Sequence, residues 1–94
     1  MYLFDWDEEK NKKNQKKHGI DFTEAASVFW DEQAIIFDDP KHSDSENRFL
    51  LIGMSERMNV CTICHCYRKS DTVIRIISAR KATKKEEAYY AKGI

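Results

Sequence analysis

The sequence contains little that would break or cross-link a fold: of its 94 residues, one is proline, three are glycine and three are cysteine. An odd number of cysteines, all lying between Cys61 and Cys66, offers no second cluster for a disulfide framework. No window approaches the ~20 apolar residues that cross a membrane, and the first residues lack a basic segment followed by an apolar run. We therefore expect a cytoplasmic chain without a membrane segment, folded as a single domain over residues 1–94.

An excess of charge of either sign is also absent, since 16 Lys and Arg residues balance 16 Asp and Glu residues. A neutral sum argues against an unspecific nucleic-acid coat, which needs a marked positive excess. The cations are nevertheless concentrated in two segments, which are separated by an acidic middle. They are Lys10, Lys12, Lys13, Lys16 and Lys17 in the first segment, and Arg75, Arg80, Lys81, Lys84 and Lys85 in the second. The chain can therefore present one basic face.

Three helices are predicted, over residues 8–17, 22–30 and 84–92, because each range follows residues that cap a helix. The expected capping residues are Asp5 or Asp7, then Asp21 with Glu24, then Thr83 with Glu86. The second helix carries a core-facing stripe at helical spacing, formed by Phe22, Ala25, Ala26, Phe29 and Trp30. The first helix is polar almost all round, so we expect the flanking Trp6 and Ile20 to dock it.

Strand patterns occupy residues 48–54, 60–67 and 73–79, which are joined by short turns and so predict an antiparallel meander. Residues 34–37 are a candidate fourth strand, followed by a polar loop over residues 38–47. The predicted fold class is therefore α+β: a small antiparallel sheet of three to four strands with two N-terminal helices and one C-terminal helix.

Arg75 lies inside an apolar strand, where a guanidinium costs several kcal/mol unless it is paired. It must therefore meet a carboxylate or face a cleft prepared for an anion, and we develop the cleft hypothesis. Strict alternation places Arg75 and Arg80 on opposite faces of the strand. If both serve one site, Arg80 must lie beyond the last paired residue, in the turn into the last helix.

The segment Cys61-Thr62-Ile63-Cys64-His65 matches the pattern by which c-type haem is attached. On a strand, however, Cys61 and His65 point to one face while Cys64 and Cys66 point to the other, so they do not converge on one ion. We expect no haem, metal or other cofactor, and interpret the cysteines as small core hydrophobes. His65 is either a hydrogen-bonded sheet residue or a catalytic one, because proton transfer at neutral pH often uses imidazole.

Several cations near one groove, without a carboxylate pair or a nucleophilic cysteine, suit a phosphate-bearing substrate. RNA supplies its own nucleophile in the 2′-OH. The protein then needs a base for that hydroxyl, cations for the charge on the phosphorane oxygens and an acid for the departing 5′ oxygen. Histidine and arginine can fill these roles without a metal. No helix pairs a basic face with an apolar stripe as a reader of DNA grooves would.

The sequence resembles the BrnT family of bacterial toxins over nearly its full length. The residues that carry the resemblance are Phe4-Asp5-Trp6-Asp7, Lys10, Asn14, Lys17-His18-Gly19-Ile20, Phe22, Glu24-Ala25, Phe29, Asp39-Pro40, His42-Ser43, Glu46, Arg48-Phe49, Gly53, His65 and Arg75-Ile76-Ile77-Ser78-Ala79-Arg80. The sequence departs from the family in its cysteine-rich strand and at Lys81, where a second arginine is common.

The resemblance implies a fold similar to the RelE toxins and a metal-independent endoribonuclease that inhibits translation. It further implies a BrnA-like antitoxin with a ribbon-helix-helix region, through which alone the complex would meet operator DNA. The candidate catalytic residues are His65, Arg75, Arg80, Arg48 and His18, and the candidate RNA-binding residues are Lys10, Lys17 and Lys81. The alternative hypothesis is a noncatalytic module that binds the antitoxin and acts in operon autoregulation.

Overall fold

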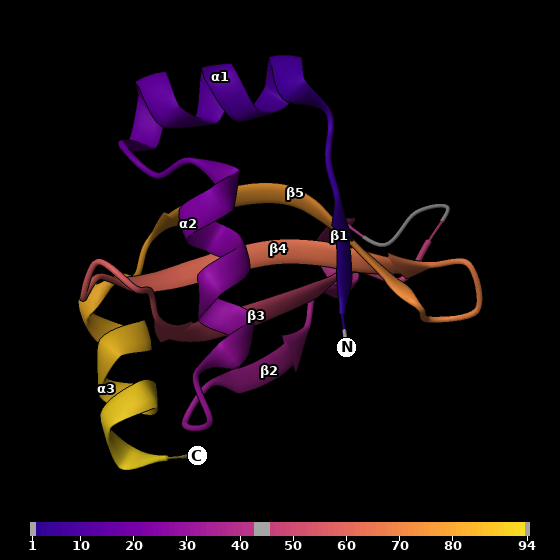
Figure 1. The fold of residues 1–94 in the computed structure, drawn as a ribbon. Helices are drawn as coiled ribbons and strands as arrows, with labels where there is room; N and C mark the ends of the chain where they lie inside the picture. The colour runs from indigo at the N-terminus through magenta and orange to yellow at the C-terminus, as the bar shows by residue number, and fades with distance from the viewer. Residues whose placement is uncertain (1, 43–45, 94) are drawn as a thin grey trace.

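The computed structural model describes residues 2–42 and 46–93, which form five strands, three α-helices and two short 3-10 helices (Figure 1). The strands are β1 (Leu3–Asp5), β2 (Ile35–Asp38), β3 (Phe49–Met54), β4 (Val60–Arg68) and β5 (Val73–Lys81). The helices are α1 (Glu8–His18), α2 (Phe22–Ser27) and α3 (Lys84–Lys92), with 3-10 helices η1 (Val28–Trp30) and η2 (Pro40–His42). The α+β class is therefore confirmed. In the polar loop predicted over 38–47, residues 43–45 lie outside the described residues.

The five strands form one sheet in the order β1-β5-β4-β3-β2. The antiparallel meander β3-β4-β5 and the fourth strand β2 are as predicted. The expectation of an entirely antiparallel sheet of three to four strands was wrong, because β1 adds a fifth strand that pairs parallel to β5. β1 has only three residues and none is buried, so it lacks the buried alternation by which a strand is recognised in a sequence.

The two faces of the sheet have different surroundings. α2 lies on one face, which we call the helix face, α1 lies along the β5 edge of the sheet, and α3 lies at the end of the sheet opposite the β4–β5 turn (Figure 1). The helix face holds the buried core, in which Phe22 and Val28 of the helical layer pack on Ile63 and Ile76 of the sheet. The opposite face, which we call the open face, carries Thr62, Cys64 and Cys66 of β4, because side chains alternate along a strand.

A β-bulge in β5 decides which of its residues share a face. Cys64 pairs with Ser78 while the next residue, His65, pairs with Ile76, so Ile77 is an extra residue without a partner in β4. Paired residues project to the same face, and the extra residue shifts the alternation by one. Arg75, Ser78 and Arg80, which pair with Cys66, Cys64 and Thr62, therefore all project to the open face.

The bulge corrects the sequence-based requirement that Arg80 lie beyond the last paired residue. Arg80 lies within β5 and is paired with Thr62, and it shares a face with Arg75 all the same. A bulge at a residue such as Ile77 has no signature in a run of apolar residues, which is why strict alternation gave the wrong parity.

α1 begins and ends as its sequence predicts, but its docking differs. Asp7 accepts a hydrogen bond from the Glu9 amide, and Gly19 closes the helix with φ 73°. The buried Asn14 holds α1 against β5: its Nδ2 donates to the Ala79 carbonyl at 2.7 Å and its Oδ1 accepts from the Ala79 amide at 3.0 Å. β1 pairs only with the first three residues of β5, so Asn14 satisfies backbone groups of β5 that no strand reaches.

α2 is shorter than predicted, since it ends at Ser27 and continues as the tighter η1. The change of helical period turns Trp30 outward, where it is 61% exposed, so its assignment to the core was wrong. Asp21 caps α2 as expected. The Glu24 carboxylate instead accepts from the Ser55 hydroxyl at 2.6 Å and from Asn59 Nδ2 at 2.8 Å, which ties α2 to the β3–β4 turn.

α3 carries the predicted capping box, in which the Thr83 hydroxyl accepts from the Glu86 amide and the Glu86 carboxylate accepts from the Thr83 amide. Tyr90 of this helix donates to the Asp31 carboxylate at 2.6 Å, so α3 is also attached to the segment after η1. In the part of the chain that the structure describes, no helix is long and apolar enough to cross a membrane.

Candidate functional site

A cationic groove lies on the open face between β4, β5 and the segment that precedes β3. Its volume is about 230 Å³, and Arg48, Ser78 and Arg80 line it together with Cys64 and Asp39. Two of the predicted catalytic arginines, Arg48 and Arg80, therefore meet in one groove. They come from segments 32 residues apart in the sequence, and the β-bulge is what places Ser78 and Arg80 on this face.

The Arg80 guanidinium is oriented by α3. Its Nη1 and Nη2 donate to the two carboxylate oxygens of Glu86 at 2.7 and 3.0 Å, and Glu86 Oε1 also accepts from the Thr62 hydroxyl. The hydrogen bonds with Glu86 raise the pKa of Arg80. Burial acts to raise the pKa of Glu86, but hydrogen bonds from Arg80, Thr83 and Thr62 outweigh it and lower that pKa to about 2. Both groups stay charged at neutral pH, so Arg80 is a fixed cation at the edge of the groove.

Arg48 lies directly before β3, and its side chain is 31% exposed. One terminal nitrogen lies 4.0 Å from a carboxylate oxygen of Glu46, at the limit of an ion pair. Arg48 lines the groove and also a neighbouring hollow of about 290 Å³. It therefore stands at the junction of two surface depressions.

A second cation-lined hollow adjoins the groove on the side of α1. Its volume is about 240 Å³, and the predicted site residues Lys10, Lys17 and His18 line it. Lys13 lines it as well and was not singled out, although its spacing of three residues from Lys10 places both on one face of a helix. Ile77 and Ser78 line both depressions, so the two depressions meet at the bulge of β5.

His65 lies away from these depressions. It pairs with Ile76 on the helix face, has no exposed surface and packs edge-to-face on Phe29 with ring centroids 4.8 Å apart. Burial lowers the pKa of His65, against a smaller raising effect of its hydrogen bond with the Ile63 carbonyl. The structure thus places His65 in the core, on the opposite face of the sheet from Arg80.

Arg75 and Lys81 are also outside the groove. Arg75 Nη1 donates to the Asp5 carboxylate at 2.8 Å. The sequence left two alternatives for this cation, a carboxylate partner or an anion-binding cleft, and the structure contains the carboxylate partner. Arg75 is not among the described residues that line the groove, so its role in catalysis stays a prediction. Lys81 pairs with Cys61 on the helix face and is exposed at the end of β5, on the other side of the sheet from Arg80.

The three cysteines are buried free thiols divided between the faces as predicted. Burial raises the pKa of Cys61 to about 11 and raises the pKa of Cys64 and of Cys66. Thiols with raised pKa values are protonated at neutral pH and are poor nucleophiles. Across residues 2–42 and 46–93, no three His, Cys, Asp or Glu side chains are grouped so as to hold a metal ion.

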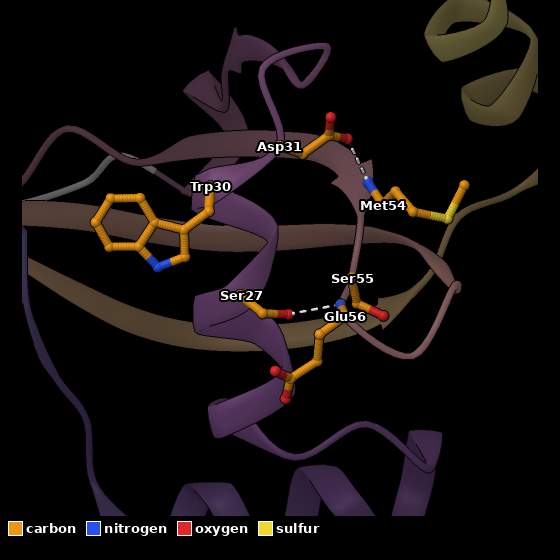
Figure 2. A pocket seen from close by; sticks show the side chains of 6 residues that line it. All are labelled: Ser27, Trp30, Asp31, Met54, Ser55 and Glu56. Carbon is orange, nitrogen blue, oxygen red and sulfur yellow. Dashed lines mark hydrogen bonds between the residues drawn. The ribbon is translucent and has the colours of Figure 1, made fainter.

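A hollow between η1 and the end of β3 differs in charge from the groove. It has a volume of about 390 Å³ and is lined by the exposed Trp30 and by the carboxylates of Asp31 and Glu56 (Figure 2). Asp31 accepts from the Met54 amide and Ser27 from the Glu56 amide, so these polar groups hold the β3–β4 turn. Its anionic lining does not suit a phosphate.

Two positions at the site were not identified as such from the sequence. Glu86 was predicted only as a capping residue, and a capping box gives no sign that its carboxylate also holds Arg80. Asn14 was named among the residues that carry the family resemblance, and it is buried between α1 and β5 beneath the α1 hollow that it helps to line. A single amide in a run of lysines is the only local signal for it.

A family model described as "Ribonuclease toxin, BrnT, of type II toxin-antitoxin system" matches residues 6–86 of the chain. Among solved structures, the ribonuclease toxin BrnT of Brucella abortus is similar, with a TM-score of 0.68 and 23% sequence identity. The match covers 89% of this chain and 100% of that one, and shows a common fold. No curated protein matches the sequence.

Proposed function

Because the chain belongs to the BrnT family of ribonuclease toxins of type II toxin–antitoxin systems, we propose that it is an endoribonuclease whose site is the cationic groove of Arg48 and Arg80. The observation that carries the proposal is the junction at Ile77 and Ser78, where the groove adjoins the lysine-lined hollow of α1. Cations on both sides of one strand form a track for a phosphate backbone, although the net charge of the chain is zero.

Arg80 is the cation that stabilises the phosphorane. Its bonds to Glu86 use one N–H on each terminal nitrogen, and a guanidinium has five N–H donors. A cation held in place before the substrate arrives spends no free energy on reorganisation during the reaction, which is the basis of electrostatic catalysis. Arg48, at the opposite wall of the groove, orients the strand to be cut. The attack is made by the 2′-OH of the RNA itself, without a metal ion.

His18 is the residue that we propose for proton transfer. Both His18 and His65 were candidate catalytic residues, and His18 is the one that lines a hollow adjoining the groove. It is half-buried at the end of α1, whereas His65 has no surface that a substrate can touch. Lys10 and Lys17 of the same hollow bind the backbone of the RNA next to the scissile phosphate.

We extend the proposal to the setting of the enzyme. The toxin acts in the cytoplasm, has the architecture of the RelE toxins and inhibits translation by cutting RNA. Its antitoxin is a BrnA-like protein with a ribbon-helix-helix region, and operator DNA is bound only through that partner. The groove attracts the antitoxin for the reason that it attracts RNA, since both interactions reward a complementary charge.

The test is cleavage of purified single-stranded RNA in the presence of a chelator and without ribosomes. We expect the parent chain to cut, and Arg80→Ala and Arg48→Ala each to cut ~100-fold more slowly or worse, because each removes a preorganised cation. Arg75→Ala is the matched control: it removes an arginine of the same strand and face that is paired with Asp5 instead of lining the groove. We expect it to cut at nearly the parent rate.

Thermal melting of each variant separates a damaged site from a damaged fold, since Arg80→Ala also leaves Glu86 without its main partner. A folded Arg80→Ala that cuts like the parent would place the site elsewhere. If no chain cuts naked RNA, the same set is assayed in a translation extract. Absence of cleavage there as well would favour the noncatalytic module, in which the cations serve only the antitoxin.

A further inference from the structure

A fifth depression lies at the end of the sheet where β4 turns into β5. Its volume is about 470 Å³, against about 230 Å³ for the cationic groove, and it is lined by Asn47, Phe49, Tyr67 and Asp71. A hollow of this size is in the range of small-molecule sites. Its lining has no cation among the described residues, so it differs in chemistry from the track proposed for phosphates.

This aromatic hollow is connected to the cationic groove only through shared lining residues at the start of β3, because Phe49 and Tyr67 lie on the helix face of the sheet and Arg80 projects to the open face. Between the two lies the hollow of about 290 Å³ that Arg48 shares with the groove. Asn47 and Phe49 line both that intermediate hollow and the aromatic hollow. An RNA strand whose phosphate lies between Arg48 and Arg80 would reach the aromatic hollow by passing Arg48 and turning round the end of the sheet at the start of β3.

Two aromatic rings form one wall. Phe49 and Tyr67 are both half-buried, and their centroids are 5.5 Å apart in an edge-to-face arrangement. His65 supports both rings from the core side, at 5.9 Å from Phe49 and 5.4 Å from Tyr67. A fixed aromatic surface that is partly open to solvent is what unpaired bases stack on in proteins that bind single-stranded RNA.

The polar wall is held by an unusual turn. Lys69, Ser70 and Asp71 all have left-handed backbone conformations, with φ of 52°, 56° and 67°. Such conformations cost about 1 kcal/mol or more for each residue that is not glycine, and they recur at binding sites. The Thr72 hydroxyl closes the turn by donating to the Lys69 carbonyl at 2.7 Å. The turn holds Asp71, which lines the hollow together with the two rings.

We propose that this hollow is a base-recognition subsite of the nuclease and that its ligand is an unpaired guanine. The inference rests on the proposed function, because it names the nucleotide beside the phosphate that the groove would hold. A carboxylate repels phosphate, so the group that enters beside Asp71 is a base. Guanine presents two adjacent donors, N1–H and N2–H, which match the two oxygens of a carboxylate. The edges of adenine, cytosine and uracil each offer a single donor group.

The direct test measures the binding of the four nucleoside 5′-monophosphates to the parent chain and to Asp71→Asn by NMR titration. We expect the guanosine nucleotide to bind the parent about tenfold or more tightly than the other three, and the preference to vanish in Asp71→Asn. Asparagine tolerates the left-handed backbone of this position, so the substitution changes the hydrogen bonding without disturbing the turn. Equal binding of all four nucleotides by the parent would overturn the proposal.

A second test maps the cut positions on an RNA of mixed sequence. We expect the parent to cut next to guanine and Asp71→Asn to cut with that bias reduced at least severalfold. Glu32→Gln is the matched control, since it removes an exposed carboxylate that does not line this hollow, and it should keep the bias. Cleavage by the parent without any base bias would overturn the subsite and leave the nuclease standing.

The two proposals fail separately. Preferential binding of the guanosine nucleotide by a chain that cuts no RNA would support the subsite and contradict the nuclease. Tyr67→Leu provides an independent variant, because it removes the stacking surface and keeps Asp71. We expect it to weaken the binding of all four nucleotides severalfold, and an undiminished affinity in a folded Tyr67→Leu chain would contradict the stacking role.

Discussion

The imidazole of His65 is enclosed by aromatic rings. Phe29, Phe49 and Tyr67 surround it with centroids 4.8, 5.9 and 5.4 Å away, and its Nδ1 N–H donates to the Ile63 carbonyl at 3.3 Å. The other nitrogen, Nε2, is buried without a hydrogen-bond partner in the described part of the chain. A polar atom left unsatisfied in the core lowers stability, and protonation there would lower it further.

At this residue we predict that His65→Leu keeps RNA cleavage within about threefold of the parent and does not lower the melting temperature at pH 7. Replacing a buried polar group by an apolar one of similar size is nearly neutral or stabilising. Burial lowers the folded-state pKa of His65 below its ordinary value of 6.5, so the unfolded chain binds the extra proton. The contribution of His65 to stability is therefore complete above pH 6.5 and is lost as pH falls through the folded-state pKa.

The measurement is urea unfolding of both chains between pH 7 and pH 5, beside a cleavage assay at pH 7. The parent should lose stability over this range and His65→Leu should lose less. A folded His65→Leu chain that cuts ~100-fold more slowly than the parent would establish His65 as catalytic, as the sequence first suggested, and would contradict our assignment of the proton transfer to His18.

At the scale of elements, α3 is attached to the sheet through the same carboxylate that orients Arg80. Glu86 accepts from Thr62 of β4, from Arg80 of β5 and from its own capping partner Thr83. One group therefore joins the helix start, two strands and the candidate catalytic cation. The stability of α3 and the geometry of the groove should consequently change together.

We predict that this attachment gives the protein an acid-sensitive step. The pKa of Glu86 falls from 4.5 to about 2 on folding, so the stability it contributes is complete above pH 4.5 and is lost as pH falls toward 2. Glu86→Gln should unfold more easily at pH 7, by about 1–3 kcal/mol, because it replaces charge-assisted hydrogen bonds with neutral ones. It should also lose less stability than the parent between pH 4.5 and pH 2.

Glu87→Gln is the control, because Glu87 is an exposed neighbour in the same first turn and has no place in this network. It should follow the parent at every pH in an urea titration followed by circular dichroism. Identical acid profiles for the parent and Glu86→Gln would show that the attachment adds no stability. If a folded Glu86→Gln chain cuts RNA as fast as the parent, the bond to Glu86 is not needed to position Arg80 for catalysis.

The sequence predicted those elements whose signals are local. A capping residue and the backbone amide that it accepts from lie within four residues of each other, which is why the starts of α1, α2 and α3 could be predicted. The parallel pairing of β1 with β5 depends on contacts between segments about 70 residues apart in the sequence. The bulge at Ile77 is one extra residue in a run of apolar residues, and no residue type marks its position. The faces of Arg75 and Arg80 follow from these, so the site could be listed by residue type but not assembled.

For the molecule as a whole, the sequence yielded a neutral charge and two cationic segments, and the structure brings part of each to one surface. Lys10 and Lys17 line the α1 hollow and Arg80 lines the groove beside it, whereas Arg75 is paired and Lys81 points to the other face. Residue type could not distinguish these cases, because each is an exposed or half-exposed cation within ten residues of another.

The side of α1 on which a lysine lies provides the last prediction. Lys10→Ala with Lys17→Ala removes two cations that line the α1 hollow, and Lys12→Ala with Lys16→Ala removes two exposed cations of the same helix that do not line it. Both variants change the net charge equally, and alanine keeps the helix.

We expect binding of a 2′-O-methylated single-stranded RNA, which has no free 2′-OH, to weaken in the first variant. Its slope of log affinity against log salt should fall by about 1.4, as expected for two lost phosphate contacts. The second variant should keep the parent slope, because only contacts with phosphate, and not net charge, release counterions. Equal slopes for the two variants would mean that the RNA does not follow this hollow.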